Sequence, residues 1–231
     1  MVASLDVLSA IVFDFDGVIA NSEPLHLRAF QDVMAAAEIT LTDREYYGNY
    51  LGFDDAGVFR AVGANRGTHW TAADIDALVS RKTARLEAIE YGMSLLFPGA
   101  ADAIRRLAAA VPLAIASGAN GTEIRRLLDR EQLTSSFAAI VPADDNLPPK
   151  PAPDPYLRAV AQLSAVRGEP IAARDCVAVE DSMWGLRSAR SAGLHTVAVT
   201  HTYPASELSE ADLIIVSLQE LTVGSLAALF G

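Results

Sequence analysis

The fold is decided by residues 8–18, Leu8-Ser9-Ala10-Ile11-Val12-Phe13-Asp14-Phe15-Asp16-Gly17-Val18. The apolar part of this stretch is continuous rather than alternating, which is typical of a strand buried on both faces of a sheet. It stops abruptly at two aspartates and a glycine, and Asp-Gly is a strong turn signal. The stretch therefore predicts a buried parallel strand that places Asp14 and Asp16 at the carboxyl edge of the sheet.

Further apolar runs along the chain end in the same abrupt way. Helical patterns lie between them, and such an alternation predicts a doubly wound α/β fold around a parallel sheet. The runs are Leu113–Ala116, Ala138–Val141, Cys176–Val179, Thr196–Val199 and Leu213–Val216. The clearest helical patterns are Ala100–Ala110, Glu123–Arg130, Pro155–Leu163 and Met183–Ala192.

One long segment interrupts this alternation. Residues 21–92 show helical patterns separated by Gly, Asn and Asp, with no good strand. We predict that residues 1–20 and 93–231 form the α/β core domain and that residues 21–92 form an inserted all-α cap domain. An insertion beside the carboxyl end of the first strand would serve as a lid, which excludes water and carries specificity contacts.

Composition narrows the possible partners. The chain has 231 residues, of which 51% are apolar, and its formal net charge is 18 − 29 = −11. This charge argues against nucleic acid or an anionic membrane as the main partner. The single cysteine, Cys176, allows no intramolecular disulfide, and no apolar run reaches the ~20 residues of a membrane span. We expect a cytoplasmic protein without a signal peptide, a monomer by default, that acts on a small molecule.

Chemically coherent side chains follow the predicted strands, where ligands bind in open α/β sheets. Carboxylates can hold Mg²⁺ through oxygen, while a hydroxyl and an ammonium can hold phosphate oxygens. One carboxylate can attack phosphorus, and a second can protonate the leaving oxygen. The residues are Asp14, Asp16, Ser117, Lys150, Glu180 and Asp181.

Four short motifs in this order resemble those of the haloacid dehalogenase superfamily in its phosphotransferase form. The insertion resembles the cap of the subfamily that includes β-phosphoglucomutase and phosphoglycolate phosphatase. The resemblance spans nearly the whole chain, and each motif follows a predicted strand. The motifs are Asp14-Phe15-Asp16-Gly17-Val18, Ser117-Gly118, Lys150-Pro151-Ala152-Pro153-Asp154 and Glu180-Asp181-Ser182.

The resemblance implies a role for each motif residue. Asp14 is the nucleophile that forms an aspartyl-phosphate, and Asp16 is the acid that protonates the leaving group and then activates water. Ser117, the Gly118 amide and Lys150 bind the phosphoryl oxygens. The implied ligands of Mg²⁺ are Asp14, the Asp16 carbonyl, Asp181 and Glu180, the last either directly or through water.

Two residues of the insertion are further candidates for the substrate-binding site. The chain has only two lysines, Lys82 and Lys150, against 18 − 2 = 16 arginines. A lysine kept in such a chain suggests a need for a compact point charge. Lys82 lies in a predicted helix, Ile75 to Ile89, where it contacts substrate or points into solvent. His26 is either a residue near the acid/base, as the resemblance implies, or an ordinary helix-surface histidine.

The fold leaves alternative activities open. A phosphomutase of the β-phosphoglucomutase type shares the core chemistry, but its cap has a basic residue that grips a distal phosphate. Here the matching stretch is Tyr50-Leu51-Gly52-Phe53-Asp54-Asp55, with two carboxylates instead, and Arg60 is the nearest substitute. A dehalogenase needs neither a metal nor Asp16, and a non-catalytic binding module needs none of the motifs. We therefore prefer a magnesium-dependent phosphatase acting on a sugar phosphate or a phosphoglycolate-like acid.

Overall fold

The structure, a computed structural model, describes residues 8–51 and 53–231. Residues 1–7 and Gly52 belong to the predicted core and cap ranges and lie outside the described residues. The described chain forms two compact units, which we call the core unit (residues 8–21 and 95–231) and the helical unit (residues 22–94, Gly52 excepted). The chain passes from one unit to the other after Asn21 and returns before Leu95.

The core unit is built on a six-stranded sheet with the order β3-β2-β1-β4-β5-β6. Every neighbouring pair is parallel. The first apolar run therefore becomes a central strand, flanked by the strands that precede the second and fourth motifs. The strands are β1 (Ala10–Phe13), β2 (Leu113–Ala116), β3 (Ala139–Val141), β4 (Cys176–Glu180), β5 (His195–Val199) and β6 (Leu213–Ile215).

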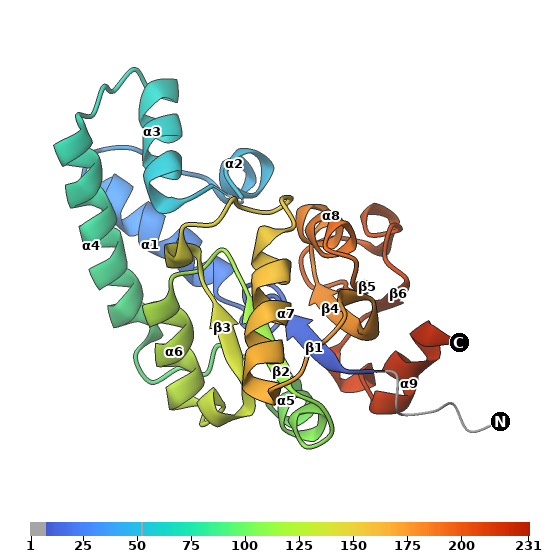
Figure 1. The fold of residues 1–231 in the computed structure, drawn as a ribbon. Coiled ribbons are helices and arrows are strands. Elements are labelled where there is room, and N and C mark those ends of the chain that lie inside the picture. Colours follow the sequence, from blue (N-terminus) through green and yellow to red (C-terminus); the bar gives the residue numbers. More distant parts are fainter. Residues whose placement is uncertain (1–7, 52) are drawn as a thin grey trace. The chain divides into compact units, whose positions relative to one another are not determined.

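Helices join these strands as the alternating pattern predicts. Helix α7 packs on β1, β2 and β3, and α8 packs on β4 and β5 (Figure 1). The two helices also contact each other, so they lie side by side on the sheet. The doubly wound parallel fold is confirmed. The helices of the core unit are α5 (Ala100–Ala108), α6 (Gly121–Arg130), α7 (Asp154–Arg167), α8 (Met183–Ser191) and α9 (Val223–Ala227).

The sheet face under α7 carries small side chains. Ala10, Ala114 and Ala178 are each fully buried there, in one cluster with residues of α7. Small residues leave room for a large side chain from the helix, and Tyr156 of α7 fills it with no exposed surface. Cys176 lies in the same cluster, and burial raises the pKa of its thiol to about 12, as expected of a structural cysteine.

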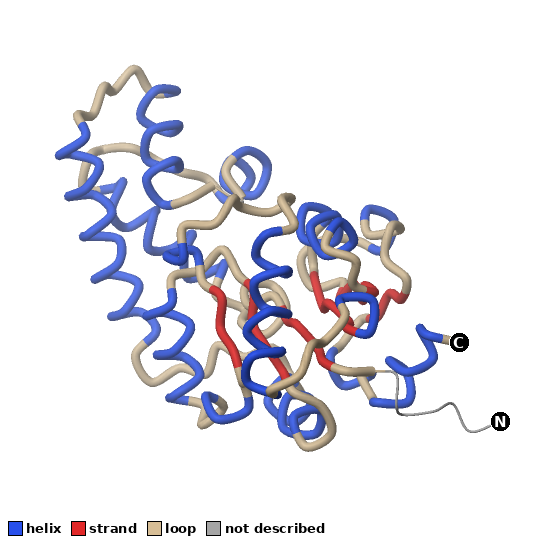
Figure 2. The backbone as a smooth tube through the Cα atoms, viewed as in Figure 1, coloured by secondary structure: helices blue, strands red, loops and turns tan. Residues whose placement is uncertain are grey.

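The helical unit has an apolar core of its own, and Figure 2 shows that its regular structure is helical. Within this core, the ring of Phe30 contacts the rings of both Tyr46 and Phe59. Thr42 and Thr71 begin two of the helices with capping boxes, which satisfy free backbone amides at the first turn. The helices are α1 (Glu23–Ala35), α2 (Asp43–Asn49), α3 (Asp55–Asn65) and α4 (Ala72–Glu90).

Within the described ranges, no helix combines the length and the apolar character that crossing a lipid bilayer requires.

Candidate active site

Three carboxylates meet at the carboxyl edge of the sheet. Asp14 follows β1, Glu180 ends β4 and Asp181 follows it. The register pairs Phe13 with Val179, so the two strands end side by side. One oxygen from each carboxylate lies within 4.8 Å of the others, and Glu180 and Asp181 are buried. The prediction that these side chains converge follows from parallel pairing, and the structure brings them together.

Lys150 supplies a cation to this group. Its Nζ lies 2.6 Å from Glu180 Oε1 and 3.0 Å from Asp14 Oδ1. Burial opposes a charged lysine here, but the two carboxylates outweigh burial and raise the pKa of the ammonium. With three carboxylates and one ammonium, the fully ionised group carries −3 + 1 = −2.

Burial and neighbouring charges raise the pKa of Asp14 and of Asp181. Burial is the largest cause that raises the pKa of Asp14, to about 6, against the attraction of Lys150. Burial, followed by the charges of Glu180 and Asp14, raises the pKa of Asp181 well above its ordinary range. A divalent cation bound among these oxygens would offset that charge, and carboxylate oxygens are the ligands that Mg²⁺ prefers. The residues present therefore fit a magnesium ion.

Two glycines make room for the carboxylates. A Cβ on Gly17 would lie 1.9 Å from Asp181 Oδ2, and the φ of Gly17, +74°, also favours glycine. A Cβ on Gly185 would lie 1.8 Å from the carboxyl carbon of Glu180. The first motif includes Gly17, whereas nothing in the sequence indicates that position 185 needs a glycine.

The turn that carries Asp16 is fixed from several sides. The Gly17 amide donates to the Ala20 carbonyl at 2.9 Å, and the Gly17 carbonyl lies 3.0 Å from His201 Nδ1. His201 also stacks on Phe97 with ring centroids 3.7 Å apart. Asp16 is half-buried in this turn, and its side chain is outside the group of three carboxylates. Sequence analysis did not single out a role for His201.

The second motif lies at the end of β2. The Ser117 amide donates to the Val141 carbonyl at 3.0 Å, and Ser117 Oγ accepts from the Ala119 amide at 3.1 Å. Ser117 is buried, whereas Gly118 is exposed, and a Cβ on Gly118 would meet no atom within 4 Å. The loop thus has open space beside its backbone, which an anion could use.

The remaining predicted residues lie in the helical unit, where they contact each other. Lys82 Nζ is 2.8 Å from Asp55 Oδ1 and 2.8 Å from His26 Nδ1. It also lies 4.8 Å from the centre of the Phe30 ring. Lys82 is 1% exposed, so the alternative of a solvated side chain is wrong. No contact with a substrate is tested by this arrangement, and that role stays a prediction.

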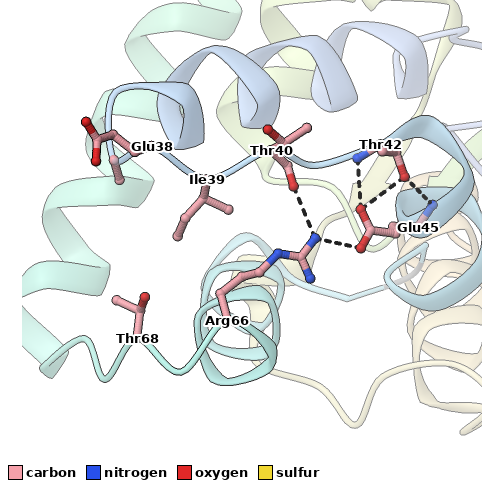
Figure 3. A pocket seen from close by; sticks show the side chains of 8 residues that line it. Glu38, Ile39, Thr40, Thr42, Glu45, Arg66 and Thr68 are labelled. Atoms are coloured by element: carbon pink, nitrogen blue, oxygen red, sulfur yellow. Dashed lines mark hydrogen bonds and ion pairs between the residues drawn. The ribbon is translucent and has the colours of Figure 1, made fainter.

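An open groove with a volume of about 750 Å³ also lies in the helical unit. Figure 3 shows its lining, with Arg66 between the Thr40 carbonyl and Glu45. Arg66 is paired with Glu45 at 2.6 Å, and none of the motif residues lines the groove. The charge of Arg66, the one cation among the described lining residues, is thus already neutralised by Glu45. The described part of the groove therefore offers no unpaired cation for a phosphate, and we do not place the reaction there.

Comparison with known proteins identifies the family. The model of the haloacid dehalogenase-like hydrolases matches residues 11–199. The chain belongs to this family. The match covers all four motifs, so the predicted family is confirmed. Relatives that are named phosphatases confirm the predicted class of enzyme, a phosphatase of this family.

Several relatives are similar to this chain over most of their length. The CbbY protein of Cupriavidus necator is 34% identical over 90% of this chain and 84% of the relative. Hexitol phosphatase B of Escherichia coli K12 is 30% identical over 94% of this chain and 96% of the relative. Among solved structures, a mutant of CbbY from Rhodobacter sphaeroides in complex with xylulose-(1,5)-bisphosphate is 27% identical, with a TM-score of 0.79. That likeness covers 93% of this chain and 96% of the other.

Proposed function

We propose that this protein is a magnesium-dependent phosphatase that hydrolyses a small sugar phosphate through an aspartyl-phosphate on Asp14. The observation that carries the proposal is the group of Asp14, Glu180 and Asp181 with Lys150 among them. Such a site combines a nucleophilic carboxylate, a cation for phosphoryl oxygens and a set of oxygen ligands.

The core residues divide the work. Asp14 attacks phosphorus, and the ammonium of Lys150, 3.0 Å away, stabilises the negative charge of the transferring group. Ser117 and the Gly118 amide bind phosphoryl oxygens from the loop after β2. Asp16, on the turn held by His201, protonates the leaving oxygen and later removes a proton from the attacking water.

Asp14, Asp181 and the Asp16 carbonyl would hold the metal, with Glu180 nearby. When bound, the ion supplies charge neutralisation for the phosphoryl group. The protein's own share is to hold Asp14 and Lys150 side by side, where the ammonium counters the burial that raises the pKa of Asp14.

The substrate class is taken from the relatives. One relative is named a hexitol phosphatase, and the CbbY structure holds a sugar bisphosphate. A phosphatase remains our preference over a phosphomutase. Asp54 caps α3 by accepting from the Gly57 amide, and Asp55 is paired with Lys82. Both carboxylates thus have a use within the helical unit, and neither replaces a phosphate-binding cation.

The helical unit is proposed as the lid that closes over bound substrate, with Lys82 and His26 as its candidate specificity residues. A monomeric state and a cytoplasmic location stay predictions.

A phosphate-release screen tests the proposal. Sugar phosphates, sugar bisphosphates, phosphoglycolate and nucleotides would be compared with Mg²⁺ and with EDTA. We expect release from a sugar phosphate only with Mg²⁺, and we expect Asp181→Ala to raise the Mg²⁺ concentration required. Full activity after complete chelation would exclude this mechanism.

A comparison of leaving groups tests Asp16. Asp16→Asn should slow release from an alkyl phosphate more than from p-nitrophenyl phosphate, because p-nitrophenolate needs less protonation. An equal loss on both esters would remove Asp16 from the acid role.

A further inference from the structure

Tyr156 is a residue of the core unit that no motif singled out. It lies on the first turn of α7, just after the third motif, and is fully buried. Its hydroxyl donates to Glu180 Oε1 at 2.6 Å. Burial, followed by the charge of Glu180, raises the pKa of this phenol, so the hydroxyl keeps its proton. A buried phenol that donates to a buried carboxylate is a short, fixed link.

Glu180 is fixed on both of its oxygens. Oε1 accepts from Lys150 Nζ at 2.6 Å and from Tyr156, while Oε2 accepts from Ser182 Oγ at 3.2 Å and from the Asp181 amide at 3.3 Å. The carboxylate is 0% exposed, and the absent side chain of Gly185 leaves its place free. Four donors hold Glu180 in one orientation, so it acts as an anchor for Lys150.

Tyr156 reaches Lys150 in a second way. The Lys150 Nζ lies 5.1 Å from the centre of the Tyr156 ring, within the range of a cation–π contact. The same Nζ is 3.0 Å from Asp14 Oδ1. We propose that Tyr156 is a positioning residue, which orients Glu180 through its hydroxyl and thereby holds the Lys150 ammonium against Asp14. This inference rests on the proposed function for its effect on turnover, but not for its effect on Lys150.

Loss of the hydroxyl has a defined consequence. In Tyr156→Phe the ring remains under Lys150, but Glu180 Oε1 keeps one donor where it had two. A buried carboxylate with a missing donor rotates toward other partners. Lys150 then samples more than one position, and small misplacements of a catalytic group have large effects on rate. We expect kcat/KM to fall by about tenfold or more.

The composition of the chain provides a readout that does not depend on activity. Because Lys82 and Lys150 are its only lysines, protein labelled at lysine Cε and Nζ gives two side-chain NMR resonances. The Lys82 resonance, assigned with Lys82→Arg, is an internal reference. Tyr156→Phe should shift or broaden the Lys150 resonance and leave the Lys82 resonance unchanged. Thr196→Val is the matched control, because it removes a buried hydroxyl bonded to Asp212 in the same unit.

A double-mutant cycle shows whether Tyr156 acts through Glu180. In the Glu180→Gln background, Tyr156→Phe should add less than about a twofold further loss of kcat/KM, because the link is already broken. Independent, multiplying losses would overturn the proposal. An unchanged Lys150 resonance in Tyr156→Phe would also overturn it. If Tyr156→Phe does not fold, wild-type protein made with 3-fluorotyrosine decides. Its more acidic phenol is a stronger donor to Glu180 Oε1 and should shift the Lys150 resonance, and an unchanged resonance would overturn the proposal. A shifted resonance in an enzyme inactive on every phosphate ester would support the positioning role and refute the phosphatase.

Discussion

Asp14→Asn should make the metal-free protein more stable while it removes the nucleophile. Folding raises the pKa of Asp14 from 3.8 to about 6, chiefly through burial. The folded state therefore holds this proton more tightly, and ionisation of Asp14 costs stability. The cost is absent below about pH 4 and fully present above about pH 6. A difference of about 2 pKa units, at 1.36 kcal/mol each, corresponds to about 3 kcal/mol in the free energy of unfolding.

Urea unfolding of EDTA-treated protein measures this difference. At pH 8 the Asp14→Asn variant should be more stable than the wild type by about 3 kcal/mol, and the difference should shrink toward pH 4. Asp145→Asn, at an exposed carboxylate of the core unit, is the control and should change stability by less than about 0.5 kcal/mol. Mg²⁺ should narrow the difference, because it binds the wild-type site more tightly. A variant that is no more stable than the wild type at pH 8 would refute the inference that ionisation of Asp14 destabilises the metal-free folded protein.

Two further predictions use close contacts in the structure. Gly185→Ala should destabilise the protein by about 1–3 kcal/mol and abolish most phosphate release, because its Cβ would displace Glu180. Gly224→Ala should do neither, because its Cβ would meet only the Thr222 hydroxyl, at an ordinary contact distance of 3.8 Å. Equal effects of both alanines would contradict the contact with Glu180. Lys82→Met removes the ion pair with Asp55 and should lower the free energy of unfolding by about 1–3 kcal/mol. The loss is smaller than for a fully buried ion pair, because the Asp55 side chain is 30% exposed. Adding Asp55→Asn should recover part of that loss in urea unfolding, and no recovery would show that the pair does not contribute.

The sequence predicted the sheet and the core of the site for one physical reason. Parallel strands end at the same edge, so residues that follow buried apolar runs must meet there. That rule predicts one site from six residues: Asp14, Asp16, Ser117, Lys150, Glu180 and Asp181. The structure brings Asp14, Lys150, Glu180 and Asp181 into one group. The continuous apolar runs predict the bounds of every strand to within two residues. The largest difference is at β1, which begins at Ala10 rather than at Leu8. Helix α7 continues past the predicted end, Leu163, to Arg167.

What the sequence missed depends on contacts between distant segments. Tyr156 has an ordinary place in an apolar helical pattern, and nothing local shows that its hydroxyl meets Glu180. The need for glycine at position 185 arises only from the depth at which that carboxylate is buried. The burial of Lys82 also depends on a distant segment, because its partner Asp55 begins a different helix, 27 residues away. Helical periodicity shows which face is apolar, but not which helix packs against it.

The most direct test of the central claim is to find the phosphoryl group on the enzyme. The protein would be mixed with Mg²⁺ and the best substrate of the screen, quenched in acid during turnover, and digested for peptide mass spectrometry. We predict one phosphoryl group on the peptide that contains Asp14, and none in Asp14→Asn. Rapid turnover with no phosphorylated peptide, or with the phosphoryl group on another residue, would contradict the account.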